Sequence, residues 1–314
     1  MALAGRVLAA GLGVGWVADQ LLGDPRRWHP VAGFGTVAAS LEGAWYADDR
    51  VRGALHEVAL VGAALGVGFA VERSVRDRPV LRVLSTAAAT WAVLGGRSLA
   101  RESEAIADHL AAGDLPGARL RVANLVSRDP ETLDADGVAR ATLESVAENT
   151  SDAVVAPLFW GAVAGIPGLL AYRAINTMDA MVGYRNPRYR LFGWAAARLD
   201  DVANWVPARV AGGLAAAAAP LVGGRWQDAA KAVREQSGHH PSPNGGVVEA
   251  AFAGALGITL GGRNTYGGVE EDRGELGFGP APTPADLIRA NRLALAVSAG
   301  ATLVSMALAS LRRR

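Results

Sequence analysis

Residues 128–204 read RDPETLDADGVARATLESVAENTSDAVVAPLFWGAVAGIPGLLAYRAINTMDAMVGYRNPRYRLFGWAAARLDDVAN. The middle of this stretch, 153–172, is an uncharged apolar run long enough for a helix that crosses a bilayer. Pro157 and Pro167 fit a kinked or re-entrant segment equally well, lining a cavity or buried in protein. Acidic and amide residues gather just before and after the run. Such groups are costly beside an apolar medium unless they are paired or bind something, so we expect a functional site here.

The rest of the chain is also apolar. Of 314 residues, 51% are hydrophobic types and only 19% are charged, and the mean hydropathy is +0.19. Further candidate spans lie at 2–18, 202–222 and 293–311. Shorter apolar runs at 58–70 and 83–96 fit short spans, hairpin arms or buried helices equally well. We therefore predict an all-α fold, a polytopic integral membrane helical protein in which the first helix is retained.

We predict one membrane-embedded domain, 1–314, with two polar sections. The first, 98–137, is a polar helical insertion that we place in water as two amphipathic helices broken at Gly113–Asp114. The second, 223–287, is a glycine-rich polar loop section around one short amphipathic helix near 247–256.

A proline-containing segment follows the first apolar run. Residues 19–35 read DQLLGDPRRWHPVAGFG, and the residue before each proline is disfavoured in a helix. We expect a rigid loop that carries Asp19, Asp24, Arg26, Arg27 and His29. On the residues alone, a capped turn at the lipid headgroups and a binding loop are equally good interpretations.

Several classes of function are excluded. The net charge is +1 and no basic stripe is present, so we expect no nucleic-acid partner. The chain has no cysteine, which rules out disulfides and cysteine-based metal sites. Walker A, HExxH and GxSxG patterns are also missing. The glycines at 11, 13 and 15 follow no strand, which favours close helix packing over a nucleotide loop, and we do not expect His239–His240 to bind a metal.

Acids, amides and arginines recur instead. Asp134 is a plausible N-cap, and a spacing of four then places Arg140, Glu144 and Glu148 on one helix face. Carboxylate oxygens suit Mg²⁺, and arginine binds phosphate or carboxylate through two hydrogen bonds. A magnesium–phosphate site is one interpretation of this set. A structural network of ion pairs between helices is the other.

Five segments in one order carry a family resemblance. They are DQLLGDPRRWHPVAGFG, ESVAENTSDAVVAPLFW, NTMDAMVGYRN, FGWAAARLDDVANW and SPNGGVVEAAFAGALGITLGG. Together they resemble the cobalamin biosynthesis family of adenosylcobinamide-phosphate synthases (cobinamide synthase, CobD/CbiB). The chain departs from the family pattern at Val247–Val248, where we expect an aromatic–proline pair, and this bears on Asn244 and Glu249.

The resemblance implies an ATP-dependent amide ligase in the cell membrane. It would join adenosylcobyric acid to aminopropanol or aminopropanol phosphate, with Mg²⁺ as cofactor and ATP as cosubstrate. It implies a multi-pass protein whose active site faces the cytoplasm. The expected partners are a corrinoid, a small amino alcohol and membrane lipid. The expected protein partners are further copies of the same chain, in a homo-oligomer, or other corrinoid-pathway enzymes. The alternatives are a corrinoid-binding or transport protein without ligase activity, and a structural membrane partner of other pathway enzymes.

The resemblance also assigns roles to residues. The acids Glu144, Glu148, Asp152 and Asp179 would be catalytic, with Glu148, Asp152 and Asp179 as metal ligands. The substrate-binding set would be Asp24, Arg26, Arg27, His29, Arg128, Asn149, Ser151, Asn176, Arg185, Asn186, Asp200, Asp201, Asn204 and Asn244.

Overall fold

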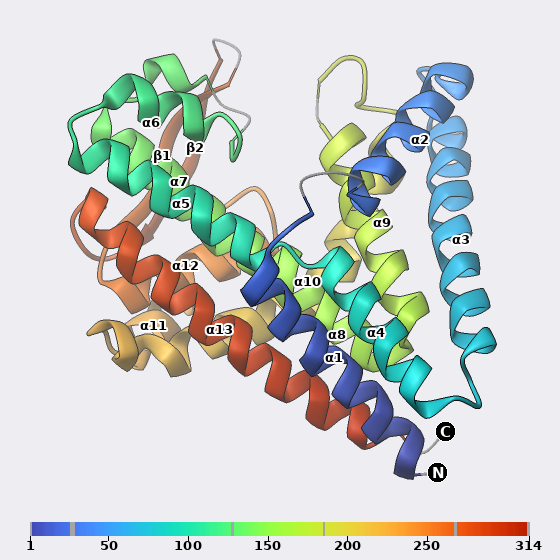
Figure 1. The fold of residues 1–314 in the computed structure, drawn as a ribbon. Coiled ribbons are helices and arrows are strands. Elements are labelled where there is room, and N and C mark those ends of the chain that lie inside the picture. Colours follow the sequence, from blue (N-terminus) through green and yellow to red (C-terminus); the bar gives the residue numbers. More distant parts are fainter. Residues whose placement is uncertain (1, 26–28, 127–128, 185, 267–268, 313–314) are drawn as a thin grey trace. The chain divides into compact units, whose positions relative to one another are not determined.

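The computed structural model describes residues 2–25, 29–126, 129–184, 186–266 and 269–312 (Figure 1). Helices dominate. Their bounds are α1 Ala2–Leu22, α2 Pro30–Trp45, α3 Arg50–Ser74, α4 Pro79–Val93, α5 Gly96–Ala111, α6 Leu115–Val122, α7 Ala135–Thr150, α8 Ala156–Ala164, α9 Ile166–Val182, α10 Trp194–Ala218, α11 Trp226–Gln236, α12 Gly245–Leu256 and α13 Pro284–Ser310. The other elements are the 3-10 turns η1 Pro130–Thr132, η3 Ala219–Val222 and η4 Ser237–His239, the π-helical turn η2 Ser151–Val155, and the strands β1 Thr259–Tyr266 and β2 Val269–Gly277.

Among the described residues, three helices are long and apolar enough to cross a membrane. They are Arg50–Ser74, Trp194–Val222 and Pro284–Ser310. The predicted all-α membrane fold class is therefore confirmed. The span predicted at 202–222 lies within one of these helices, and the span predicted at 293–311 lies in another, which ends at Ser310. The run at 58–70 lies in the third, which begins eight residues earlier.

The chain divides into two compact units. Unit 1 consists of Met1–Arg97, Asp152–Asn204 and Ala301–Arg314. Unit 2 consists of Ser98–Ser151 and Trp205–Gly300. Each unit is built from segments far apart in the sequence, so each brings together residues that no local pattern connects.

In unit 1, α1 packs closely on α4 (Figure 1). A Cβ added at Gly11 would lie 2.5 Å from the Cβ of Thr86, and one at Gly15 would lie 2.7 Å from the carbonyl oxygen of Ala87. These distances are too short for any side chain. The prediction that the early glycines serve helix packing is confirmed.

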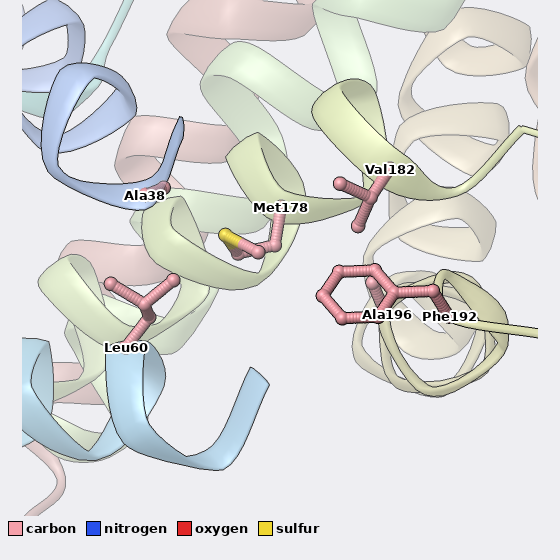
Figure 2. Close-up of a cluster of buried hydrophobic side chains, with 6 residues drawn as sticks. All are labelled: Ala38, Leu60, Met178, Val182, Phe192 and Ala196. Carbon is pink, nitrogen blue, oxygen red and sulfur yellow. The ribbon is translucent and has the colours of Figure 1, made fainter. Parts of the chain in front are cut away.

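A second layer of unit 1 joins α3 to α9. Figure 2 shows the apolar cluster of Ala38, Leu60, Met178, Val182, Phe192 and Ala196, contributed by α2, α3, α9 and the region where α10 begins. Leu60 and Met178 are almost fully buried. Glu57 lies one helical turn before Leu60, and Asp179 directly follows Met178. This core therefore fixes the helices that carry both acids.

The apolar run 153–172 is broken rather than continuous. It starts in η2, continues as α8 and stops at Gly165, whose φ of +74° lies in the region that favours glycine. A new helix, α9, then begins at Ile166. The sequence allowed either one continuous span or a kinked or re-entrant segment, and the structure has an interrupted segment.

Proline 207 lies inside α10. Because proline has no N–H, the carbonyl four residues earlier, that of Ala203, loses its helical donor. The indole Nε1–H of Trp160 in α8 donates to this carbonyl oxygen at 3.0 Å. A side chain from another helix thus replaces the missing backbone bond.

Unit 2 contains the predicted helical insertion. Helices α5 and α6 are separated by Gly113, which has a φ of +73°, as predicted. Asp134 caps α7, because its carboxylate accepts the Gly137 N–H at 2.8 Å. This prediction is also confirmed.

The section 223–287 is more ordered than a loop system. It holds α11, α12 and an antiparallel hairpin in which Thr259 pairs with Gly277 and Tyr266 with Val269, with a bulge between Gly261 and Arg263. Every residue of α12 is buried, so the predicted amphipathic character of 247–256 is wrong. Its Ala-, Gly- and Val-rich sequence lets neighbours pack on all sides. The 19–35 loop is also shorter than predicted, since α1 extends to Leu22 and α2 begins at Pro30.

Candidate functional site

A polar network in unit 1 links α9 to α10. Tyr172 donates its hydroxyl hydrogen to Asn204 Oδ1 at 2.8 Å. Asn204 Nδ2 donates to Asp200 Oδ2 at 3.0 Å, and Asn176 Nδ2 donates to Asp200 Oδ1 at 3.4 Å. Arg173 Nη1 donates to Asn176 Oδ1 at 3.3 Å. These five residues, called the α9–α10 network below, form one continuous hydrogen-bonded series.

The helix spacing explains this network. Tyr172 and Asn176 are four residues apart on α9, and Asp200 and Asn204 are four apart on α10, so each pair shares a helix face. Tyr172 and Asn204 are almost fully buried, each 1% exposed. Buried amides and hydroxyls need partners. The network supplies them and fixes the orientation of Asp200.

Further acids surround the network. The Tyr172 hydroxyl oxygen lies 3.1 Å from the carbonyl oxygen of Asp152, and the Asp152 carboxylate interacts electrostatically with Tyr172 and Arg173. Asp179 lies two turns after Tyr172 on α9. Among the groups described here, carboxylates outnumber the single guanidinium of Arg173, so this region attracts cations.

Glu57 of α3 belongs to the same region and was missed from the sequence. It is 2% exposed, and neither carboxylate oxygen has a hydrogen-bond partner in the described part of the chain. Its electrostatic neighbours are Asp179 and Asp200. The sequence did hold a signal for Glu57, which is a single acidic residue within an apolar stretch. An ionisable residue in a candidate membrane span marks a functional site by default.

Asp19 and Asp24 lie at the N-terminal edge of unit 1. Asp19 is fully buried, and its Oδ2 accepts the Gln20 side-chain amide at 2.9 Å and the Arg97 N–H at 3.3 Å. Burial and then the Asp24 carboxylate raise the pKa of Asp19 to about 6. His29 caps α2, since its Nδ1 accepts the Val31 N–H at 3.1 Å, and its Nε2 lies 3.9 Å from Asp24 Oδ2.

A second polar cluster lies in unit 2, where η4 leads into α12. His240 Nδ1 lies 3.1 Å from the Ser242 N–H nitrogen and 3.3 Å from the Ser242 carbonyl oxygen. The His240 Nε2 lies 3.3 Å from Glu249 Oε1, and both side chains are only 2% exposed. A Cβ at Gly245 would lie 3.3 Å from Glu148 Oε1 and 3.1 Å from His240 Cε1. Glu148, His240 and Glu249 therefore gather around a glycine that leaves them room.

In the described part of the chain, three of the remaining predicted residues of unit 2 have structural partners, and the Ser151 side chain does not. Glu144 Oε1 accepts the Gly261 N–H at 2.9 Å, which ties α7 to the hairpin. Asn244 Oδ1 accepts a hydrogen bond from Arg209 Nη1 at 3.1 Å. Asn149 Nδ2 donates to the Ser145 carbonyl at 2.9 Å. The buried Ser151 hydroxyl has no hydrogen-bond partner among the described residues.

Two further predicted residues of unit 1, like the acids and His29 described above, lie outside the network. Asp201 Oδ2 accepts from Arg198 Nη1 at 3.2 Å, and Asn186 Oδ1 accepts the Tyr189 N–H at 2.9 Å in an exposed turn. The predicted arginines lie outside the described residues: these are Arg26, Arg27, Arg128 and Arg185.

The predicted metal ligands are divided between the units. Glu148 belongs to unit 2, whereas Asp152 and Asp179 belong to unit 1. Within the described ranges, no group of three or more His, Asp or Glu side chains is arranged to hold a metal. The oxygen donors of unit 1 nevertheless have the chemistry that Mg²⁺ prefers, and this ion commonly takes only one or two carboxylates together with substrate phosphates.

Comparisons with known proteins agree along the chain. A family model described as CobD/Cbib protein matches residues 12–294. The cobalamin biosynthesis protein CobD of Mycobacterium tuberculosis is 51% identical over 306 residues, which cover 97% of both chains. The proteins of the same name from Chromobacterium violaceum and Rhodobacter capsulatus are each 44% identical, over 90% of both chains for the first and over 93% of this chain and 92% of the relative for the second. No solved structure was found to match. The predicted family is confirmed, and the chain belongs to the CobD/CbiB family.

Proposed function

We propose that this protein is an ATP-dependent amide ligase that joins adenosylcobyric acid to aminopropanol or aminopropanol phosphate. Its role in cobalamin biosynthesis follows from membership of the family, whose relatives carry that name. The reaction itself is the proposal. The observation that supports it best is the α9–α10 network, in which Asp200 is oriented by two amides beside the unsatisfied Glu57.

The proposed reaction has two steps. A propionate oxygen of the corrinoid attacks the terminal phosphorus of ATP, the bond to ADP breaks, and an acyl phosphate forms. The neutral amine then attacks the acyl carbon, the C–N bond forms, and the C–O bond to phosphate breaks. The amine must lose one proton before attack and a second one afterwards. A carboxylate that can accept these protons is therefore required.

The acids of unit 1 suit this task. Aminopropanol arrives as an ammonium ion, which is attracted by Glu57, Asp179 and Asp200. Asp200 is held in place by Asn176 and Asn204, so it can meet the amine at a defined position. The amides of the network also match the donors and acceptors of a substrate rich in side-chain amides.

Magnesium would be held by Asp152, Asp179 or Asp200 together with the phosphates of ATP. It would supply charge neutralisation on the transferred phosphoryl group. Glu148, His240 and Glu249 in unit 2 offer a second acid–base set, in which His240 Nε2 lies 3.3 Å from Glu249 Oε1.

The test is turnover by purified protein in lipid nanodiscs. With adenosylcobyric acid, Mg-ATP and either form of aminopropanol, we expect a corrinoid product of higher mass and an equal amount of ADP. Asp200→Asn should lower the rate about a hundredfold or more, which is typical for loss of a positioned proton acceptor. Asp228→Asn is the control, because Asp228 also lies on a helix, α11, but its side chain is exposed.

The outcomes separate the alternatives. A transport or corrinoid-binding protein would bind the corrinoid and release it unchanged, without forming ADP. That result would contradict the ligase proposal. Product formed with only one of the two amines would identify the acceptor.

A further inference from the structure

Unit 1 contains a pocket of about 760 Å³ away from the α9–α10 network. It is lined by the first turns of α1, the last turns of α3, the beginning of α4 and the segment after α13. Helices α1 and α4 start here, and α3, α8 and α13 end here, so their opposing dipoles partly cancel. The charge of the pocket is then set by its side chains.

The lining is basic. Four arginines face two acids, Glu72 and Asp77. Arg82 is neutralised by Glu72 at 3.1 Å, and Arg312 Nη1 donates to the Ala162 carbonyl at 3.4 Å. Arg73 and Arg76 are exposed, and in the described part of the chain neither forms an ion pair. These two guanidinium groups are available for an anion.

The lining also has an apolar part. Leu8 is buried, and Phe69 is 63% exposed one turn before Arg73 on α3. Phe69 lies in α3, one of the three candidate membrane spans. Exposed phenylalanine and free arginine are therefore neighbours at the end of a span, where acyl chains give way to headgroups.

We infer that this pocket binds a phosphoryl group, with the anionic headgroup of a membrane phospholipid as its first source. Guanidinium groups bind phosphate oxygens through paired hydrogen bonds, and basic pockets between membrane helices recognise anionic headgroups. The apolar part of the lining accommodates the adjoining acyl chain. A soluble phosphate compound shares the headgroup's chemistry and is the second source.

The experiment is native mass spectrometry of detergent-purified protein titrated with phosphatidylglycerol and with phosphatidylcholine, and in separate arms with inorganic phosphate and with ATP. We expect the wild type to prefer phosphatidylglycerol. The double variant Arg73→Gln/Arg76→Gln should bind it about thirty-fold more weakly, because each arginine near an anionic surface contributes roughly a factor of five. Arg52→Gln, at the other end of α3, should bind as the wild type does.

A lysine double variant keeps the positive charge, and it controls for a loss of binding that is caused by misfolding. Arg73→Lys/Arg76→Lys should retain more affinity than the glutamine variant. If the glutamine variant loses affinity for phosphate or ATP but not for phosphatidylglycerol, the source is a soluble phosphate. Two results would overturn the inference. In the first, the glutamine variant binds every probe as tightly as the wild type does. In the second, the wild type does not distinguish phosphatidylglycerol from phosphatidylcholine and binds neither phosphate nor ATP.

Discussion

At the residue scale, the buried acids of unit 1 are the features that a structural role explains least. Glu57 is nearly inaccessible, lacks hydrogen-bond partners among the described residues and has two acids as neighbours. Nothing in its own helix compensates it. A cationic ligand would.

Glu57→Gln should therefore separate stability from function. Glutamine keeps the shape of the side chain and cannot ionise beside Asp179 and Asp200, so the free energy of unfolding should be unchanged or rise by up to about 1 kcal/mol, while amide formation falls. Thermal unfolding and turnover in the same nanodiscs measure both. Glu131→Gln, at a side chain that is 82% exposed, is the control. A loss of stability with full activity would assign Glu57 to packing alone.

Asp19 should make stability depend on pH. Its pKa is about 6 in the folded protein against 3.8 for the unperturbed group, so the folded state binds the proton more tightly. Stability should then be greatest at low pH and fall as the pH rises from about 4 through 6, by on the order of 2–3 kcal/mol in total. Asp19→Asn should flatten this part of the curve of stability against pH. Thermal unfolding of both proteins at a series of pH values measures this change. An unchanged slope in the variant would contradict the assignment.

At the element scale, local sequence signals predicted the helices well, but they predicted poorly which elements pack against each helix. The cap at Asp134 and the break near Gly113 were read from the sequence because a helix signal is local. The hairpin β1–β2 was not, because its residues are rich in glycine and lack alternating apolar side chains. Helix α12 was misread because burial on every side depends on neighbours from α11, the hairpin and α7.

The α1–α4 contact offers a test with a matched pair of glycines. Gly15→Ala should destabilise the protein by about 1–3 kcal/mol, because its Cβ would meet Thr90 and Ala87. Gly66→Ala in α3 should be neutral or slightly stabilising, because nothing lies within 4 Å of its Cβ. Thermal unfolding compares them. Equal effects would show that α1 does not rest on α4 in this way.

The bond from Trp160 to Ala203 can be isolated in a double-mutant cycle. Trp160→Phe should cost about 1–3 kcal/mol, because the Ala203 carbonyl loses its donor. In a Pro207→Ala background the cost should be smaller, since residue 207 then supplies an N–H. The free energies of unfolding of all four proteins give the coupling. Equal costs in both backgrounds would mean that the indole contributes only by packing.

At the scale of the whole molecule, the family and fold class could be predicted because five separated motifs and the apolar composition are properties of the chain itself. The site could be predicted only in part. Asp200, Asn204 and Asn176 came from the central stretch, whereas Glu57 lies more than a hundred residues before its neighbours on α9 and α10. Such contacts depend on which helices pack together, and no spacing rule contains that information.

The candidate spans predict how the protein partitions. Most of the apolar window in each is unburied, with only 28% of it buried in Arg50–Ser74, so each needs a nonpolar surrounding. We expect the protein to stay in the membrane pellet after alkaline carbonate extraction and to require detergent for release. Release by carbonate alone, or by high salt, would contradict a transmembrane arrangement.

The proline in α10 has a consequence for biosynthesis of the chain. In α10 the carbonyl of Ala203 has no backbone N–H to accept, and in the described part of the chain its donor is the indole of Trp160, which is synthesised about forty residues earlier. During translation, Trp160 is therefore synthesised before Ala203, whose carbonyl it serves. The Trp160 indole is therefore already present when α10 is made, and it is available to the Ala203 carbonyl as this helix enters the membrane.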